Sequence, residues 1–179
     1  MISANPISMK KIIALLAVVL FFSSCKKDIS ALPDAPGTGS EKFGAAVNGK
    51  LWVPQKFGIM PSAQILEARY EPDNSFVINA RNFASSPKES EFEFRLKNIT
   101  APGVYVLGGD SENSAYYVER TITPTGEWKT NTQHTGTITI TVNDKTNKIL
   151  AGTFQFQAGS LYGREPITVT DGRFDVKVQ

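Results

Sequence analysis

The stretch "GTFQFQA", residues 152–158, decides the fold because its apolar and polar side chains alternate strictly. In an extended chain Phe154 and Phe156 fall on one face, and the polar residues between and beside them fall on the other. This period of two is typical of a β-strand with one buried and one solvated face. The stretch therefore predicts a strand with both phenylalanines in the core.

Three further stretches alternate in the same way, and seven more give weaker strand signals. The three are "EFEFRLK" (91–97), "TITITV" (137–142) and "RFDVKV" (173–178). The weaker ones are "FGAAVNG" (43–49), "LWV" (51–53), "QILEARY" (64–70), "FVINAR" (76–81), "GVYVLG" (103–108), "SAYYVERT" (114–121) and "ITVT" (167–170).

Turn-forming residues separate these stretches, and Asp171–Gly172 between the last two strands predicts a two-residue hairpin. No segment after Phe43 shows a helical period. About ten short strands with such turns predict an all-β fold, a single antiparallel β-sandwich with a β-barrel as the alternative. We expect this one domain to span residues 43–179.

The N-terminal region has the pattern of a signal peptide. Lys10 and Lys11 precede the apolar run Ile12–Phe22, which ends at small serines. As a helix this run would span about 16 Å, whereas a bilayer core is about 30 Å thick. We therefore expect residues 1–24 to be removed as a signal rather than to span a membrane, and Met9 is a better start than Met1 for such a signal.

Cys25 is the only cysteine in the chain, so it cannot form an internal disulfide. It directly follows the small residues of "FFSSC", which resembles the lipobox of a bacterial lipoprotein signal. Cys25 is therefore predicted to be the lipid attachment site, the alternative being a signal peptide with an incidental cysteine. Residues 25–42, rich in Pro, Gly, Ser and charge, are predicted to form the lipidated cysteine and a flexible tether.

Charge excludes one class of partner. The sequence has 19 basic and 17 acidic residues, and loss of Lys10 and Lys11 with the signal makes the two numbers equal. No basic run interleaves with aromatic residues after the tether. Nucleic-acid binding is therefore not expected.

Motifs for catalysis are weak. "LGGDS" resembles the nucleophile turn of an esterase, with Ser111 as nucleophile, but the only histidine, His134, lies in a predicted all-β region without the required α/β scaffold. Glu91 and Glu93 share a strand face as a glycosidase pair would, yet Arg95 continues the row as on a solvated strand. We predict no catalytic residues and no enzyme activity.

Metal and cofactor sites are not predicted either. One histidine and a lipidated cysteine cannot provide the three or four ligands of a transition-metal site. The oxygens of residues 110–113 could contribute to a calcium site, but no EF-hand spacing accompanies them, and a solvated acidic turn is the better interpretation.

Aromatic residues provide the remaining candidates for ligand binding: Tyr116, Tyr117 and Trp128. Adjacent Tyr116 and Tyr117 must point to opposite faces of a strand, so one of them should point outward. An outward aromatic ring beside polar residues can stack on a sugar or anchor a protein. The competing interpretation places these rings in the core, as expected for Trp52.

Five motifs together resemble a known group of proteins: "FGAAVNGKLW", "GVYVLGG", "AYYV", "TGTITITVNDKTNKILAGTFQFQA" and "ITVTDGRFDV". Behind a lipobox and a tether, this series resembles small lipoproteins of Bacteroidetes-type bacteria that are grouped as a domain of unknown function. The resemblance implies a β-sandwich on a lipid anchor, and it implies no activity or catalytic residue.

The expected function is that of a lipid-anchored lipoprotein of the cell envelope, a noncatalytic binding or interaction module for a glycan or an envelope protein. A structural accessory subunit of an envelope complex is the alternative, and a hydrolase is third. Lys26 follows Cys25 where a retention signal would have aspartate, which favours the outer membrane. Surface export of such lipoproteins is associated with a lysine followed by two or more acidic residues, whereas Lys27 is followed by the single acid Asp28. We therefore expect surface display only slightly more than a periplasm-facing position.

Overall fold

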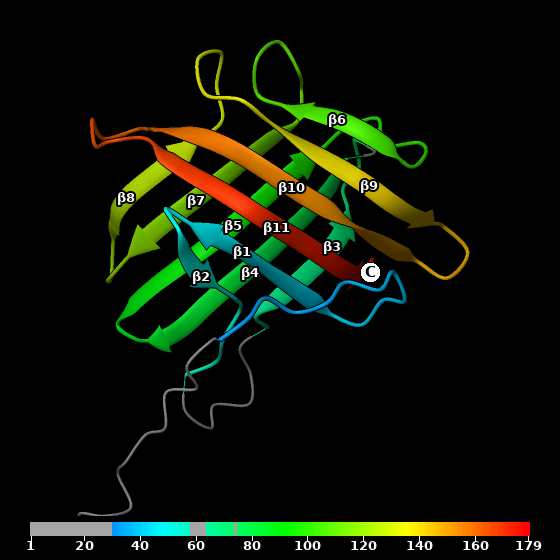
Figure 1. Ribbon diagram of the computed structural model, residues 1–179, viewed down its shortest axis with the longest axis horizontal. Helices are drawn as coiled ribbons and strands as arrows, with labels where there is room; N and C mark the ends of the chain where they lie inside the picture. The colour runs from blue at the N-terminus through cyan, green and yellow to red at the C-terminus, as the bar shows by residue number, and fades with distance from the viewer. Residues whose placement is uncertain (1–29, 58–63, 74) are drawn as a thin grey trace, which may run out of the picture.

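The longest strand, β10 (Ile149–Ser160), joins the two layers of the computed structural model, which describes residues 30–57, 64–73 and 75–179. Through Ile149–Phe156, β10 pairs with β9 (Gly136–Asp144), and at Gly159 and Ser160 it pairs with β8 (Pro124–Lys129). The strand therefore begins in one layer and ends beside the other (Figure 1).

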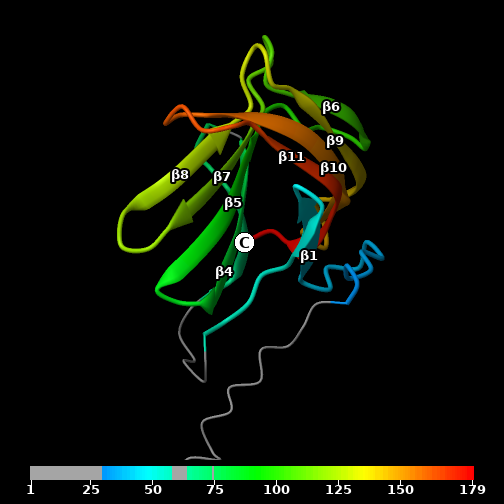
Figure 2. The same cartoon turned by 60° about the vertical axis from the view of Figure 1, so that its left-hand side comes forward.

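All named strands pair antiparallel within one sheet. The other strands are β1 (Lys42–Val47), β2 (Lys50–Trp52), β3 (Leu66–Tyr70), β4 (Phe76–Ser85), β5 (Lys88–Leu96), β6 (Gly103–Leu107), β7 (Ser114–Arg120) and β11 (Ile167–Lys177). The first layer has the order β2-β1-β11-β10-β9-β6, and the second has the order β8-β7-β5-β4-β3 (Figure 1). Figure 2 shows the two layers from the side. A parallel bridge between Ala68 of β3 and Val178 joins the layers at the other side.

The predicted all-β class is confirmed, because the described part of the chain forms strands and no helix. Within those residues, no helix could cross a bilayer. The two facing layers form a sandwich. Because β10 pairs with strands of both layers and one bridge joins them at β3, the sandwich is partly closed, as in the β-barrel that was the alternative prediction.

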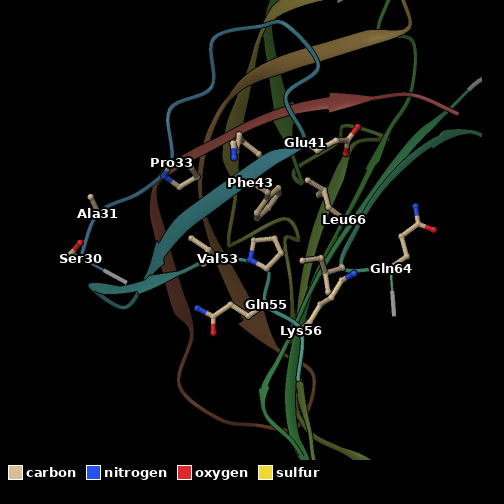
Figure 3. Close-up of a pocket in the computed structure, with 13 residues that line it drawn as sticks. Ser30, Ala31, Pro33, Glu41, Phe43, Val53, Gln55, Lys56, Gln64 and Leu66 are labelled. Carbon is tan, nitrogen blue, oxygen red and sulfur yellow. The ribbon is translucent and has the colours of Figure 1, made fainter. Parts of the chain in front are cut away.

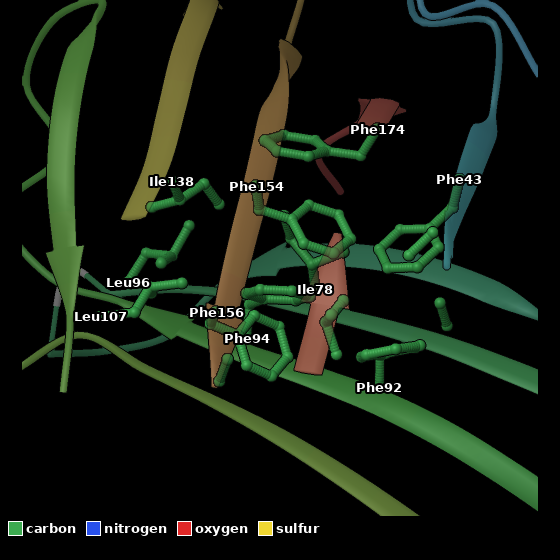
Figure 4. Packing of buried hydrophobic residues seen from close by; sticks show 14 of the residues in the cluster. Phe43, Ile78, Phe92, Phe94, Leu96, Leu107, Ile138, Phe154, Phe156 and Phe174 are labelled. Carbon is green, nitrogen blue, oxygen red and sulfur yellow. The ribbon is translucent and has the colours of Figure 1, made fainter. Parts of the chain in front are cut away.

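Phenylalanines from both layers meet in the core (Figure 4). The ring of Phe154 on β10 lies 4.7 Å from that of Phe94 on β5 and 5.3 Å from that of Phe43 on β1, measured between centroids. The Trp52 ring on β2 lies 4.7 Å from Phe92. Aromatic pairs at such separations add to the stability gained from burial alone. The Phe154–Phe94 and Trp52–Phe92 contacts hold the two layers face to face.

The predicted hairpin at Asp171–Gly172 is wrong, because β11 runs through both residues as one strand. Phe154 of β10 pairs with Gly172 and Phe156 pairs with Val169, so β11 has one extra residue between these pairs. Asp171 has a φ of 55°, which together with the register shift defines a β-bulge. A Cβ on Gly172 would lie 2.3 Å from the Phe154 ring, so glycine lets that ring pack against the strand.

A two-residue hairpin is found at Asn48–Gly49, between β1 and β2. Both residues have positive φ, 47° and 76°, as a type I′ turn requires. β8 was not predicted, because Pro124 and Gly126 interrupt the alternation of its sequence "PTGEWK".

The assignment of residues 25–42 to a flexible tether does not hold for Gly37–Ser40, which are bound to the outer face of the first layer. Asp175 of β11 points away from the core, and its carboxylate accepts hydrogen bonds from the backbone N–H groups of Gly37, Thr38 and Gly39 at 3.1, 3.1 and 2.7 Å. The Ser40 hydroxyl donates to the same carboxylate at 2.7 Å.

Residues 30–41, which we call the strap, cover Asp175 so completely that it has no exposed surface. Leu32 and Pro33 lie against Gly44 of β1, and Gly37 lies against Val142 of β9. Burial alone would raise the pKa of Asp175. The hydrogen bonds from Ser40 and the strap backbone outweigh this effect and hold the pKa below its ordinary value.

The strand register generates the first prediction. Phe154→Ala or Phe156→Ala should lower the free energy of unfolding by about 3–5 kcal/mol, because each ring is buried between the layers. Gln155→Ala, on the exposed face of the same strand, is the matched control and should cost less than about 1 kcal/mol. Urea melts of the three variants measure this, and equal losses at all three positions would contradict the register.

The second prediction concerns the Asp175 contact. Asp175→Asn should lower the free energy of unfolding at pH 7 by about 1.5–3 kcal/mol or more, because a charged acceptor of four hydrogen bonds is lost. The folded-state pKa of Asp175 lies below that of an ordinary aspartate side chain, so the stabilisation by its carboxylate is present above the ordinary pKa and is lost as the pH falls through the folded-state pKa.

The difference in the free energy of unfolding between wild type and Asp175→Asn should therefore shrink as the pH is lowered below the pKa of an ordinary carboxyl group. Urea melts at a series of pH values measure this difference. Asp171→Asn, which alters an exposed carboxylate four residues away on the same strand, is the control. A difference that stays constant down to strongly acidic pH would mean that the carboxylate charge is not what holds the strap.

Candidate functional site

The inner face of the second layer changes from apolar to polar toward one end of the sandwich. Side chains two residues apart on a strand point to the same face, so cross-strand partners form successive rows. One row is apolar and lies in the core: Ala80, Phe92, Tyr117 and Trp128. The next row, toward the hairpins, is Asn82, Ser90, Glu119 and Gly126.

This second row borders a cleft of about 640 Å³, which we call the mouth cleft. The β4–β5 and β7–β8 hairpins and the β10–β11 connection contribute to it (Figures 1 and 2). The residues that line it are Asn82, Ser85, Lys88, Glu89, Ser90, Tyr117, Glu119, Arg120, Thr121, Thr125 and Arg164. Every one of these side chains has a polar group, although the core begins one row away.

Arg164, in the β10–β11 connection, forms one wall of the mouth cleft. Its guanidinium lies 5.0 Å from the centre of the Trp128 ring, donates to the Thr125 carbonyl at 3.2 Å and lies 3.7 Å from the Glu119 carboxylate. A Cβ on Gly126 would come within 2.3 Å of that ring and 2.4 Å of the guanidinium. Gly126 therefore provides the space in which Arg164 covers the tryptophan.

Hydroxyl groups form the inner end of the cleft. Ser90 Oγ accepts a hydrogen bond from Trp52 Nε1 at 2.8 Å, which links the cleft to the core. Burial raises the pKa of Tyr117 to about 12, although a hydrogen bond with Ser90 opposes the shift. The Tyr117 hydroxyl thus stays protonated at neutral pH and can donate a hydrogen bond.

Two cleft residues have structural roles of their own. The Asn82 side chain donates to the Val53 carbonyl at 2.7 Å and accepts from the Ala84 N–H at 2.9 Å, so its amide ties β4 to the chain after β2. Arg120 donates to Glu91 on the outer face of the sheet at 2.6 Å, and its Nε is buried without a hydrogen-bond partner. Lys88, Glu119 and Arg164 are left as the charged groups that can face a ligand.

The carboxylates do not converge on the cleft as a catalytic pair would. Ser90 pairs with Glu119, whereas Glu89 pairs with Arg120, so Glu89 and Glu119 belong to opposite faces of the sheet. On the outer face Glu91 is held by Arg81 at 3.1 Å and by Arg120. The sheet therefore has one carboxylate that faces the cleft, that of Glu119. A single carboxylate can accept hydrogen bonds, whereas acid–base catalysis of glycoside hydrolysis needs a pair.

The structure does not bring the predicted aromatic residues together on one exposed surface. Tyr117 and Trp128 are buried, as the competing core interpretation expected, yet Tyr117 lines the mouth cleft and Trp128 lies beneath Arg164. Tyr116 points to the outer face, where partial burial and the Glu127 carboxylate raise its pKa. The sequence predicted that one of the two adjacent tyrosines points outward, and this tyrosine is Tyr116.

Ser111 and His134 lie in loops that meet where Gly109 N–H donates to the Asn131 carbonyl at 2.9 Å. Each side chain is used within its own loop: Ser111 Oγ accepts from the Asn113 N–H at 3.1 Å, and His134 Nδ1 lies 3.3 Å from Asn131 Oδ1. These contacts suit the loop interpretation rather than a nucleophile and its base.

The acidic turn at residues 110–113 is likewise occupied by internal contacts. Asn113 Oδ1 accepts from the Lys97 N–H at 2.7 Å, and Glu112 forms an ion pair with the Lys97 ammonium at 3.0 Å. Over the described ranges, no three His, Cys, Asp or Glu side chains gather in a group that could hold a metal ion.

A second cavity, of about 710 Å³, lies between the strap, the chain after β2 and the start of β3 (Figure 3). Its lining is Ser30, Ala31, Pro33, Glu41, Lys42, Phe43, Val53, Pro54, Gln55, Lys56, Gln64, Ile65 and Leu66. It is more apolar than the mouth cleft and we call it the strap cavity. Cys25, the predicted lipidation site, lies outside the described residues.

Comparison with known proteins gives a family and no individual relative. A family model described as "Domain of unknown function (DUF6252)" matches residues 42–177. These limits coincide with the first residue of β1 and the last of β11. Neither the curated proteins nor the solved structures contain a match to the chain.

Proposed function

Since the chain belongs to the DUF6252 family, whose function is unknown, we propose that it is a noncatalytic, lipid-anchored module of the cell envelope that binds a glycan in the mouth cleft. The observation that supports this most is the inward-facing polar row at the end of the core, with Ser90 and Glu119 beside Tyr117 and Arg164. Asn82 and Ser90 of this row also form hydrogen bonds within the fold, whereas Glu119 and Arg164 line the cleft with charged groups.

The chemistry of the cleft suits a ligand rich in hydroxyl groups. Arg164, Lys88 and Tyr117 are donors, and Glu119 is an acceptor, within one cleft of about 640 Å³. A sugar hydroxyl both donates and accepts, so it can bridge neighbouring donors and acceptors of this kind. Pockets of this volume are typical of small-ligand sites.

The anchor is proposed from the sequence. The short apolar run Ile12–Phe22 ends at "SSC", and Cys25 is the chain's single cysteine. Several acyl chains on one cysteine hold a protein stably on a membrane without spanning it. Lys26 in place of aspartate favours the outer membrane as the location.

The alternative, an accessory subunit of an envelope complex, has support from β6. This five-residue edge strand pairs only with β9 among the described strands and has no charged residue. Val104 and Val106 on it are 68% and 50% exposed. An uncharged edge of this kind can accept a strand from a partner protein.

The third prediction tests the cleft. Glu119→Gln should weaken glycan binding about 10- to 100-fold, because a charged acceptor contributes about 1.5–3 kcal/mol. The control is Glu127→Gln, which alters a carboxylate near Tyr116 on the outer face. A glycan array identifies the sugar, and titration then gives the affinities.

Tryptophan fluorescence provides the readout in solution. The chain has two tryptophans, and both touch cleft residues: Trp52 at Ser90 and Trp128 at Arg164. Glycan binding in the cleft should change this fluorescence in wild type and in Glu127→Gln at the same glycan concentration. Equal affinities for wild type and Glu119→Gln, or no bound glycan on a broad array, would refute the proposal.

The fourth prediction tests the anchor. Cys25→Ser should abolish lipidation and release the protein from membranes, because no other cysteine can replace it. Detergent phase partitioning and the intact mass of the mature protein measure this. A serine variant that partitions with wild type after signal cleavage would disprove the anchor.

Trypsin treatment of intact cells then gives the side of the membrane. Lys26 and Lys27 precede the strap, whereas Gly37–Ser40 are bound to Asp175, so cleavage should occur before the strap. Release of the folded domain from intact cells indicates surface display. Release only after lysis indicates a periplasm-facing position.

A further inference from the structure

The strap brings the folded domain close to the proposed anchor. Ser30, the first described residue, lies five positions after Cys25 and lines the strap cavity. Five residues span at most about 18 Å even when fully extended. This inference rests on the proposed lipidation of Cys25, which would place Ser30 within that distance of the lipid attachment point. A tether free up to residue 42 would have allowed a much longer reach.

The surface next to Ser30 combines basic and apolar side chains. Lys42 and Lys56 line the same cavity as Ser30, and both are exposed. Phe57, which follows Lys56, is 49% exposed, an unusual position for a phenylalanine in a chain whose other aromatic rings are mostly in the core. Glu41, the one acidic residue of the lining, accepts a hydrogen bond from the Lys177 N–H at 2.9 Å.

Backbone contacts fix this surface relative to the sheet. Gln55 N–H donates to the Arg81 carbonyl, and Phe83 N–H donates to the Gln55 carbonyl at 2.8 Å. Lys56 and Phe57 therefore follow directly after a residue whose backbone is hydrogen-bonded to β4.

We propose that the patch formed by Ser30, Ala31, Lys42, Lys56 and Phe57 lies against the phospholipid surface to which Cys25 is anchored. Phe57 enters the interfacial region, and the two lysines lie beside anionic headgroups. Aromatic rings prefer the membrane interface, and basic residues are attracted to an anionic leaflet. The short distance to Cys25 selects a membrane as the occupant, because it leaves a soluble partner little room between this patch and the bilayer.

The test uses the full mature lipoprotein in vesicles that contain anionic phospholipid. Because the Cys25 sulfur is bonded to lipid, an introduced cysteine is the only free thiol for an environment-sensitive fluorophore. Phe57→Cys places the probe in the patch. Val104→Cys places the same probe at another exposed apolar position, on β6, on the opposite side of the molecule from the β4–β5 hairpin (Figures 1 and 2).

Brominated lipids should quench the probe at residue 57, whose emission shifts to the blue, and should leave the probe at residue 104 unquenched. Lys56→Glu in the Phe57→Cys background should reduce this quenching, and added salt should reduce it as well. Equal quenching at both positions, or no quenching at residue 57, overturns the inference.

Flotation and intact mass, measured on the same samples, separate this failure from failure of the anchor. Protein that floats with the vesicles and carries lipid, but shows no quenching at residue 57, is anchored without the proposed contact. Protein that neither floats nor carries lipid refutes the anchor and, with it, this inference.

Discussion

The contact of Phe154 with Phe94 of the opposite layer is the interaction on which the rest of the structure depends. The centre of the Phe154 ring lies 4.7 Å from that of Phe94 on β5, which joins the inner faces of the two layers, and 5.3 Å from that of Phe43 within its own layer. The Phe154 ring packs against β11 at the bulge of Asp171, where Gly172 has no side chain that would collide with it. Where the aromatic rows end, the inner face carries the polar side chains that line the mouth cleft, Asn82, Ser90 and Glu119. Their polar groups are not buried without partners, so they do not destabilise the core.

A second constraint acts on the outer face of the first layer. Asp175 is a fully buried carboxylate, and burial of a charge is costly unless hydrogen bonds compensate. The strap provides three backbone N–H groups and one hydroxyl for this purpose, and in return it is held to β11. Its glycines at residues 37 and 39 have φ of 79° and 72°, a conformation that other residues rarely adopt. What composition suggested to be a flexible linker is thus partly an element of the fold.

Alternation predicted the fold class and most strands because it reports directly which face of a strand is buried, as Phe154 and Phe156 show. It failed at Asp171–Gly172, since the same dipeptide serves a hairpin or a bulge and only the pairing with β10 decides between them. The mouth cleft could not be predicted, because Ser90 and Glu119 become neighbours through the β5–β7 register. Arg164 joins them from a connection with no periodic signal.

The two constraints also place the strap and the mouth cleft so that the proposed anchoring and the proposed binding would not interfere in one small domain. The strap crosses β1, β11 and β9 on the outer face of the first layer, whereas the mouth cleft opens along the inner face of the second. Attachment of the strap therefore does not block the cleft. Arg164 is held over Trp128 by the cation–π contact and by Thr125, so the wall of the cleft is in place before a ligand arrives. A preformed wall spares the ligand the entropy cost of ordering a loop, which favours binding of a weakly held, hydroxyl-rich molecule.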